Sequence, residues 1–315
     1  MEEQQIDRRV RPAWLEIDDW AAADGWRLRR FHIAPALDVE PRGSLLFQTG
    51  RADFIEKYIE SFDHWRRQGW AIEGFDWRGQ GGSGRLLDNG RTGHGPPYEV
   101  MVGDLAGYCD DWVGRTAGPH ILLGHSMGGH LVLRLLAEHP IPIDGAVLLS
   151  PMLGLNAGMI GERIGRLIAC LLCWIGWAER PAWSEDSNKG SGHRQRNLTH
   201  SDERYADELW WRAHDSILDV GPPTWGWLRD SWLSIATLFQ PGVLERVETR
   251  TLVLCPEQDR LVMTPAANRA ASRLPNARLI CHPQAAHELL REVDPIRKWV
   301  LAEIDGFLGS IGKRT

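Results

Sequence analysis

A run of six residues at positions 124–129, Gly-His-Ser-Met-Gly-Gly, restricts the fold more than any other part of the sequence. The apolar stretch 121–123 before it suits a buried strand, and apolar residues after it repeat at helical spacing. A serine between a strand and a helix sits in a strained turn, with its hydroxyl exposed above the sheet. Glycines at 124 and 128 leave room for that turn. The pattern predicts Ser126 as a nucleophile; the alternative is an ordinary glycine-rich turn.

Strand-like and helix-like segments alternate along most of the chain. The expected strands are 43–47, 70–75, 121–123, 145–150, 251–255 and 277–281. The expected helices are 53–68, 99–113, 265–273 and 295–308. This alternation predicts an α/β fold in which a mostly parallel sheet is covered by helices on both faces.

The segment between Ser150 and Thr251 breaks the alternation, with helical patterns and loops but no convincing strand. It holds half of the 16 tryptophans. We predict a helical, Trp-rich cap, residues 151–245, inserted after the sixth strand of the sheet. The core domain would then consist of residues 1–150 and 246–315. The polar stretch 184–192 within the cap is expected to be a mobile loop.

Composition narrows the class of protein further. The net charge of −6 and the pI near 6.1 give no reason to expect a nucleic-acid partner. Residues 1–12 lack the apolar core of a signal peptide, and five cysteines do not suggest a disulfide framework. A reducing cytoplasm is therefore the expected location. The sequence indicates no oligomeric state.

Cys170 and Cys173 form a C-x-x-C pattern inside an apolar run, residues 167–178. No second ligand cluster is evident, so we interpret them as core cysteines on a helix rather than as a redox or zinc pair. The run is too short to span a bilayer.

Two residues after the strand 251–255 are candidates for the acid of a catalytic triad. A serine hydroxyl needs an adjacent base that is itself oriented by an acid, and in turns of this kind the chain order is serine, acid, histidine. Glu257 and Asp259 both follow the strand. We favour Asp259 because the apolar pair 261–262 can anchor its loop with the carboxylate turned inward.

Two histidines follow the last expected strand, 277–281. His287 opens a helix-like segment and can project from a loop over the strand ends, so we predict it as the base. His282 lies directly at the end of the strand and is expected to be an ordinary loop residue.

The tetrahedral intermediate of such a mechanism needs two backbone N–H donors aimed at its oxyanion. One is expected from Met127, directly after the nucleophile. The other is expected from the loop 48–51, where Gly50 lets the backbone turn and Arg51 donates. The alternative is that this loop is only a connecting turn.

A glycine-dense loop at residues 79–84 does not fit the G-x-G-x-x-G spacing of a dinucleotide site, and no obvious helix follows it. We interpret it as a tight loop beside the active site.

These segments together resemble the α/β-hydrolase superfamily, and within it the lysophospholipase and monoacylglycerol lipase branch. The resemblance covers nearly the whole chain. It is carried by Thr49-Gly50-Arg51 through Tyr58, Asp76-Trp77-Arg78-Gly79-Gln80-Gly81, residues 124–129, Ser150-Pro151, Gln258-Asp259-Arg260-Leu261-Val262 and Ala286-His287-Glu288. The resemblance implies a serine esterase acting on a lysophospholipid or monoacylglycerol, with no metal and no organic cofactor.

The serine alone does not distinguish an esterase or lipase from a thioesterase, aminopeptidase or acyltransferase. A lipid ester is favoured because an apolar, aromatic cap suits an acyl chain, with the Arg51 side chain near the mouth of the cleft. Such a cap also allows transient contact with a membrane surface. An alternative resembling proline iminopeptidases would hold a substrate amine with Glu203, Asp207 or Glu208. A non-catalytic binding protein is a third hypothesis.

Overall fold

One sheet forms the centre of the molecule. The structure is a computed structural model that describes residues 6–184 and 193–311. Within these residues, eight strands form a sheet of order β1-β2-β4-β3-β5-β6-β7-β8. In chain order they are β1 (Glu16–Ala21), β2 (Arg27–Ile33), β3 (Gly43–Gln48), β4 (Trp70–Phe75), β5 (His120–His125), β6 (Gly145–Leu149), β7 (Thr251–Pro256) and β8 (Ala277–His282). Neighbours from β4 to β8 pair in parallel, which confirms the mostly parallel sheet predicted from the sequence.

The first two strands lie at one edge of the sheet, and the sequence pattern does not reveal them. β1 pairs with β2, and β2 with β4, both antiparallel. β1 lies at the edge and buries none of its side chains fully. It therefore lacks the strong apolar alternation that identifies a half-buried strand.

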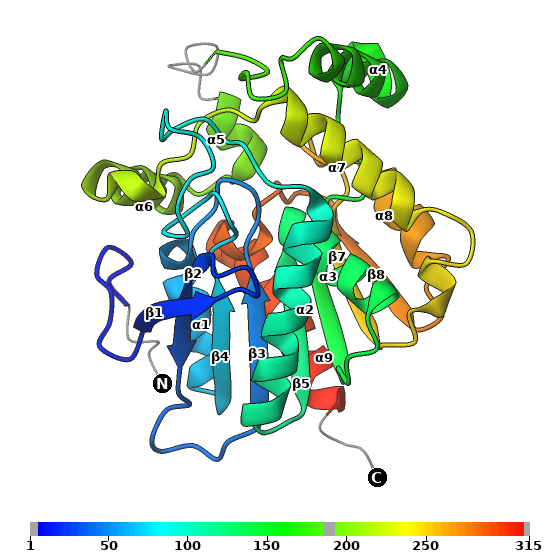
Figure 1. Ribbon diagram of the computed structural model, residues 1–315. Coiled ribbons are helices and arrows are strands. Elements are labelled where there is room, and N and C mark those ends of the chain that lie inside the picture. The colour runs from blue at the N-terminus through cyan, green and yellow to red at the C-terminus, as the bar shows by residue number, and fades with distance from the viewer. Residues whose placement is uncertain (1–5, 185–192, 312–315) are drawn as a thin grey trace.

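Helices cover both faces of the sheet, as the sequence predicts. They are α1 (Ile59–Arg66), α2 (Tyr98–Arg115), α3 (Met127–Glu138), α8 (Thr264–Ala271) and α9 (Asp294–Ile311). Figure 1 shows α2 and α3 in front of the strands and α9 behind them. In β5, Leu122 packs in the layer with α2 and α3, whereas Ile121 and Leu123 pack in the layer with α1 and α9. Successive strand side chains point to opposite faces, so both layers fix the end of β5.

The segment between β6 and β7 is helical and lies over one end of the sheet. Its helices are α4 (Gly161–Trp174), α5 (His193–Leu198), α6 (Asp202–His214) and α7 (Trp225–Leu238), and its described residues add no strand to the sheet. Figure 1 shows α4 and α7 on one side of this end, and α5 and α6 on the other. Residues 185–192, most of the predicted mobile loop, lie outside the described residues. The boundary of the cap at 151–245 stays a prediction.

Helix α4 is more exposed than the sequence leads us to expect. Gly165 and Ala169 are the buried residues of this helix, all of which is described, and they form a narrow stripe that packs against α7. Cys170 and Cys173 lie on the helix as predicted but are only partly buried, because they fall outside that stripe. The prediction that they are core residues is therefore wrong. No helix in the described parts of the chain is long and apolar enough to cross a membrane.

Candidate active site

The turn between β5 and α3 places Ser126 at the carboxyl end of the sheet. Ser126 has φ 53° and ψ −115°, a strained conformation for a residue with a side chain. A Cβ on Gly124 would lie 2.7 Å from the backbone of Gly128, and one on Gly128 would lie 2.5 Å from the carbonyl oxygen of Gln48. Both glycines are therefore required by the close approach of the backbone around the serine.

Three predicted residues from three different loops meet at this point. Ser126 Oγ lies 3.0 Å from Nε2 of His287, and His287 Nδ1 lies 2.7 Å from Oδ2 of Asp259. Asp259 follows β7 and His287 follows β8, so neighbouring strand ends supply the acid and the base. The side chains of Asp259 and His287 are 0% and 4% exposed. This is the geometry of a Ser-His-Asp triad.

Asp259 is held by its own loop as well as by the histidine. Its Oδ1 accepts hydrogen bonds from the backbone N–H of Leu261 at 2.8 Å and of Val262 at 3.1 Å. Val262 is buried but Leu261 is exposed, so only half of the expected apolar anchor is formed. Burial opposes ionisation of Asp259, but the charge of His287 and these hydrogen bonds outweigh it, and the pKa is lowered. The carboxylate therefore remains charged beside the imidazole.

The contact with Asp259 also sets the pKa of the His287 imidazole. Burial alone would lower its pKa, but the charge and hydrogen bond of Asp259 outweigh burial, and the pKa of His287 is raised. Its backbone carbonyl accepts a hydrogen bond of 2.7 Å from Ser150 Oγ. An imidazole with these contacts has a fixed orientation and is suited to take a proton from Ser126.

The two rejected candidates lie away from the serine. Glu257 is exposed, and its backbone N–H donates to the carbonyl of His282 at 3.0 Å. The ring of His282 packs edge-on against Trp299, with 4.9 Å between ring centres.

The loop after β3 leaves one backbone amide without a hydrogen bond within the described residues. Gly50 N donates to Oδ2 of Asp53 at 3.2 Å, and Ala52 N donates to Oε1 of Gln80 at 2.8 Å. Arg51 N, between them, has no hydrogen-bond partner in the described part of the chain. Gln80 belongs to the glycine-dense loop, which thus supports the neighbouring loop.

The turn in this loop differs from the expectation. The positive φ of 55° belongs to Ala52 rather than to Gly50. Gly50 instead lies close to the site, because a Cβ there would be in tight contact, 3.1 Å from both His125 Nδ1 and Ser126 Cβ. On the other side of the serine, Met127 begins α3, where backbone amides have no intrahelical acceptor.

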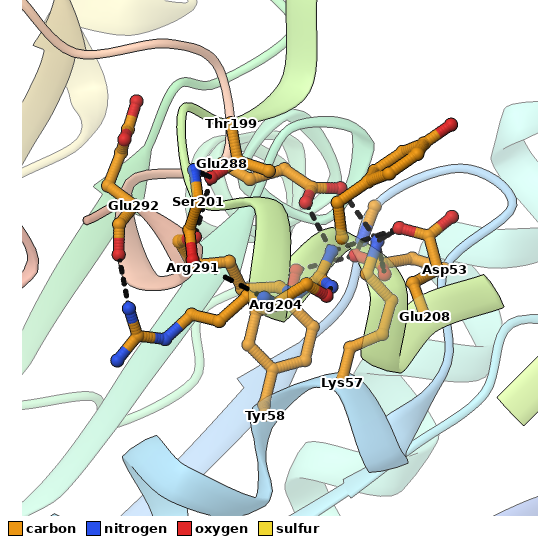
Figure 2. A network of polar contacts seen from close by, with 12 residues as sticks. Asp53, Lys57, Tyr58, Thr199, Ser201, Arg204, Glu208, Glu288, Arg291 and Glu292 are labelled. Carbon is orange, nitrogen blue, oxygen red and sulfur yellow. Dashed lines mark hydrogen bonds and ion pairs between the residues drawn. The ribbon is translucent and has the colours of Figure 1, made fainter. Parts of the chain in front are cut away.

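Sequence reasoning missed a buried group of charges behind the site, here called the Lys57 cluster. Its members are Asp53, Lys57, Glu208, Glu288 and Arg291. Lys57 Nζ lies 2.8 Å from Asp53, 3.1 Å from Glu208 and 2.6 Å from Glu288. Figure 2 shows how these residues lie. The Lys57 side chain is 2% exposed. Burial opposes its charge, but the three carboxylates outweigh burial and raise its pKa.

The Lys57 cluster joins the cap to the catalytic loops. Glu208 on α6 lies 2.9 Å from Arg291, which also pairs with Glu288, the residue after His287. Asp53, at the other end, holds the amide of Gly50. Nearby, Arg204 of α6 donates to the carbonyl of Glu292 at 2.7 Å (Figure 2). The only sequence signal was the i, i+4 spacing of Asp53 and Lys57, which does not reveal burial.

A cavity of about 410 Å³ opens over Ser126 and His287. Its cap side is apolar, and we call these residues the apolar roof: Ile160, Ile168, Trp183, Trp225, Trp227, Leu228 and Trp232. Four of the eight cap tryptophans therefore line the cavity. Trp174 and Trp177 are exposed, and Trp211 donates to the carbonyl of Arg8.

The carboxylates that a peptidase would need are already paired. Asp207 lies 2.6 Å from Arg8 and 2.7 Å from Arg9, and the exposed Glu203 lies 3.3 Å from Arg8. Glu208 is within the Lys57 cluster, and none of the three lines the cavity. Among the described residues, no three His, Cys, Asp or Glu side chains are grouped so that they could hold a metal ion.

The fold and this site together define the class of protein, an α/β-hydrolase of the serine hydrolase type. Residues 39–294 match the family described as "Serine aminopeptidase, S33", and the chain belongs to that family. It is 30% identical over 275 residues to lysophospholipase L2 of Escherichia coli strain K12, covering 82% of this chain and 78% of the relative. It is 28% identical over 269 residues to the probable lysophospholipase L2 of Haemophilus influenzae, covering 85% and 84%.

Solved structures share the fold over nearly the whole chain. A soluble variant of monoglyceride lipase from Saccharomyces cerevisiae has a TM-score of 0.75 at 16% identity, covering 98% of this chain and 99% of its own. A carboxyl esterase from Bacillus coagulans has a TM-score of 0.71 at 17% identity, covering 96% and 100%. At such identities the likeness concerns the fold alone, and it confirms the α/β-hydrolase fold expected from the sequence.

Proposed function

We propose that this chain hydrolyses carboxylic esters of single-chain lipids through an acyl-enzyme on Ser126. The observation that carries the proposal is the hydrogen-bonded chain Ser126–His287–Asp259 at the floor of an apolar cavity. Relatives named lysophospholipase L2 and a structural neighbour named monoglyceride lipase support the substrate class. A lysophospholipid and a monoacylglycerol both present one acyl ester to such a cavity.

The reaction follows from the geometry in two steps. Ser126 Oγ attacks the ester carbonyl carbon while His287 Nε2 takes the hydroxyl proton. The bond to the alcohol then breaks, and His287 returns the proton to the leaving oxygen. A water molecule attacks the acyl-Ser126 with His287 again as base, which releases the fatty acid and restores the serine. Asp259 stabilises the imidazolium in both steps.

The amides of Arg51 and Met127 are proposed to bind the oxyanion. They flank the serine on two sides, and Arg51 N has no acceptor within the described chain. Preorganised donors of this kind stabilise the charge that develops in the transition state. Gly50 and Ala52, held by Asp53 and Gln80, fix the loop that carries the Arg51 amide.

The cap, residues 151–245, is proposed to select the substrate and to touch a membrane surface transiently. Ile160 and Ile168 line the cavity from the start of α4 and from α4 itself. The other side of this helix exposes Leu167, Leu171 and Trp174 to solvent. An apolar helix face that continues into the cavity suits a lipid surface, from which the acyl chain can enter. The free cysteines are consistent with a cytoplasmic enzyme.

Labelling by a fluorophosphonate probe tests the mechanism, and a substrate panel tests the class. Wild type should label and should hydrolyse p-nitrophenyl esters, monoacylglycerols and lysophospholipids. Ser126→Ala should lose labelling, and its kcat should fall about 10⁴- to 10⁶-fold. Undiminished labelling of folded Ser126→Ala would reject the nucleophile. Cleavage of aminoacyl-naphthylamides in place of lipid esters would favour the aminopeptidase.

A further inference from the structure

Arg51 is one of the residues that line the cavity, and its guanidinium has no carboxylate partner among the described residues. Its guanidinium donates one hydrogen bond in the described chain, from Nη2 to the carbonyl oxygen of Gly221 at 2.6 Å. Its Nε is buried and has no partner. A guanidinium carries five N–H donors, so most of this hydrogen-bonding capacity is unused.

Other well-buried arginines in the described chain behave differently, because each is paired with a carboxylate. They are Arg29, Arg78, Arg134, Arg204, Arg291 and Arg297. A buried charge without a counter-ion is costly, so a buried cation is normally paired. Arg51 breaks this rule at the wall of the cavity that contains Ser126.

The guanidinium is nevertheless held in a defined position. It lies over the ring of Trp227, 5.2 Å from the ring centre, in a cation–π contact. Gly93 leaves the space that Nη2 occupies, because a Cβ at that position would collide with it. A cation fixed by an aromatic face, a carbonyl group and a glycine is preorganised for a ligand.

The charges around the cavity leave Arg51 as an uncompensated cation. Asp53 and Glu288 also line the cavity, but Lys57 lies between them and pairs with both. Burial lowers the pKa of Arg51 to about 9, and the charge of Arg212 adds to the effect. An anion beside the guanidinium would reverse this shift.

We propose that the Arg51 guanidinium binds the phosphate group of a lysophospholipid whose acyl ester lies at Ser126. This rests on the proposed function and sharpens it, because a monoacylglycerol has no phosphate to offer. The planar guanidinium of arginine can donate two parallel N–H hydrogen bonds to two oxygens of one phosphate. The backbone amide of Arg51 is also a proposed oxyanion donor. The loop after β3 would therefore contact the acyl ester with the Arg51 amide and the phosphate with the Arg51 side chain.

The test compares two substrates with the same acyl chain, a 1-acyl lysophosphatidylethanolamine and the matching 1-monoacylglycerol. In Arg51→Met, the ratio of kcat/KM for the lysophospholipid to that for the monoacylglycerol should fall about tenfold to a hundredfold. The ratio cancels any loss shared by both substrates, such as a shift of the Arg51 amide. Arg51→Lys keeps the positive charge but cannot donate two parallel hydrogen bonds, so its ratio should lie between those of wild type and Arg51→Met.

Two further variants test whether a change in this ratio comes from the position of the Arg51 guanidinium. Gly93→Ala would place a Cβ 2.0 Å from Nη2 of Arg51 and 2.8 Å from the carbonyl oxygen of Gly221, its acceptor, so it should displace the guanidinium without changing residue 51 and should lower the same ratio. Arg260, an exposed arginine at the rim of the cavity, is the matched control. Arg260→Met should change the ratio by less than about twofold. An unchanged ratio in Arg51→Met, or a larger loss in Arg260→Met, would overturn the proposal.

A binding experiment separates this proposal from the proposed function. Glycerol 3-phosphate should slow fluorophosphonate labelling of wild type in a saturable manner, and should not slow labelling of Arg51→Met. If wild type hydrolysed neither lipid, the proposed function would fail, but this protection would still support the anion site. If glycerol 3-phosphate protected neither protein, or both equally, the anion site would be rejected.

Discussion

The Lys57 cluster and the apolar roof border the same cavity but are built in opposite ways. In the Lys57 cluster, buried charges from η1 (Ile55–Tyr58), α6 and the His287 loop pair with one another. The apolar roof consists of apolar side chains, and its helix α4 meets α7 only through the narrow stripe around Gly165. Trp174, near the end of α4 and outside the roof, is 83% exposed. One side of the cap is fixed to the catalytic loops by ion pairs, whereas the other offers apolar surface to a ligand.

This difference assigns two tasks to two regions. Buried ion pairs are directional and tolerate little movement, so the Lys57 cluster can fix the loops of Asp53 and His287. Apolar contacts are non-directional and tolerate variation in ligand shape, so the apolar roof can accept acyl chains. We therefore expect changes near the Lys57 cluster to affect chemistry and stability, and changes in the roof to affect substrate choice.

The largest effect is expected where the catalytic chemistry lies. Asp259→Asn should lower kcat about 10⁴-fold, because the acid fixes the imidazole tautomer and stabilises its charged form. In wild type, kcat/KM should rise with pH through the raised pKa of His287, since only the neutral imidazole is a base. In Asp259→Asn the carboxylate no longer raises the pKa of His287, so the rise of the residual kcat/KM with pH should begin at lower pH.

Glu257→Gln is the matched control for this substitution, because Glu257 is an exposed carboxylate two residues away. It should leave the pH profile unchanged. A profile that shifted in Glu257→Gln but not in Asp259→Asn would show that the acid is misassigned.

Removing the lysine of the Lys57 cluster should lower stability more strongly than it lowers activity. Lys57→Met leaves Asp53 and Glu288 buried with one cation fewer, and should lower the free energy of unfolding by about 3–5 kcal/mol. Lys298 is exposed, so Lys298→Met should change it by less than about 0.5 kcal/mol. Denaturant titration of both variants measures the difference. Equal stability of the two variants would mean that the cluster does not hold the cap.

The elbow and the triad could be predicted because short-range rules govern them. Gly124 and Gly128 are dictated by a local close approach, and Asp259 and His287 follow strands whose ends must meet at one edge of a parallel sheet. Such features depend on the order of elements and on turn chemistry. Both can be recognised without knowledge of the tertiary contacts.

The Lys57 cluster and the exposure of α4 could not be predicted in the same way. Lys57 and Glu208 are far apart in the sequence, and charged residues are ordinarily solvated, so only the docking of α6 reveals their burial. Cys170 and Cys173 lie in an apolar run that predicts burial, yet α4 packs through only one stripe. In both cases, tertiary contacts rather than local sequence decide which side chains are buried.

A smaller, graded effect should come from the substrate rather than from a variant. If the apolar roof holds the acyl chain, kcat/KM should climb from acetyl toward palmitoyl esters until the cavity is full. Each methylene that is fully buried contributes about 0.8 kcal/mol, or roughly fourfold in kcat/KM. A monotonic fall from the acetyl ester onward would contradict an acyl-binding roof.

The smallest effect on catalysis of a dissolved ester is expected on the outer face of α4. Leu167 and Leu171 are 68% and 55% exposed and do not line the cavity. Replacing both with serine should therefore change kcat/KM for p-nitrophenyl butyrate by less than about twofold. The free energy of unfolding should change by less than about 0.5 kcal/mol. Binding to vesicles that contain anionic lipid should nevertheless fall at least about tenfold, because two leucines no longer enter the interface. Leu37, fully exposed in the loop between β2 and β3, is the matched control, and Leu37→Ser should bind vesicles as wild type does. Cosedimentation measures the bound fraction. Equal binding of the α4 double variant and of Leu37→Ser would show that the exposed face of α4 serves another purpose than contact with lipid.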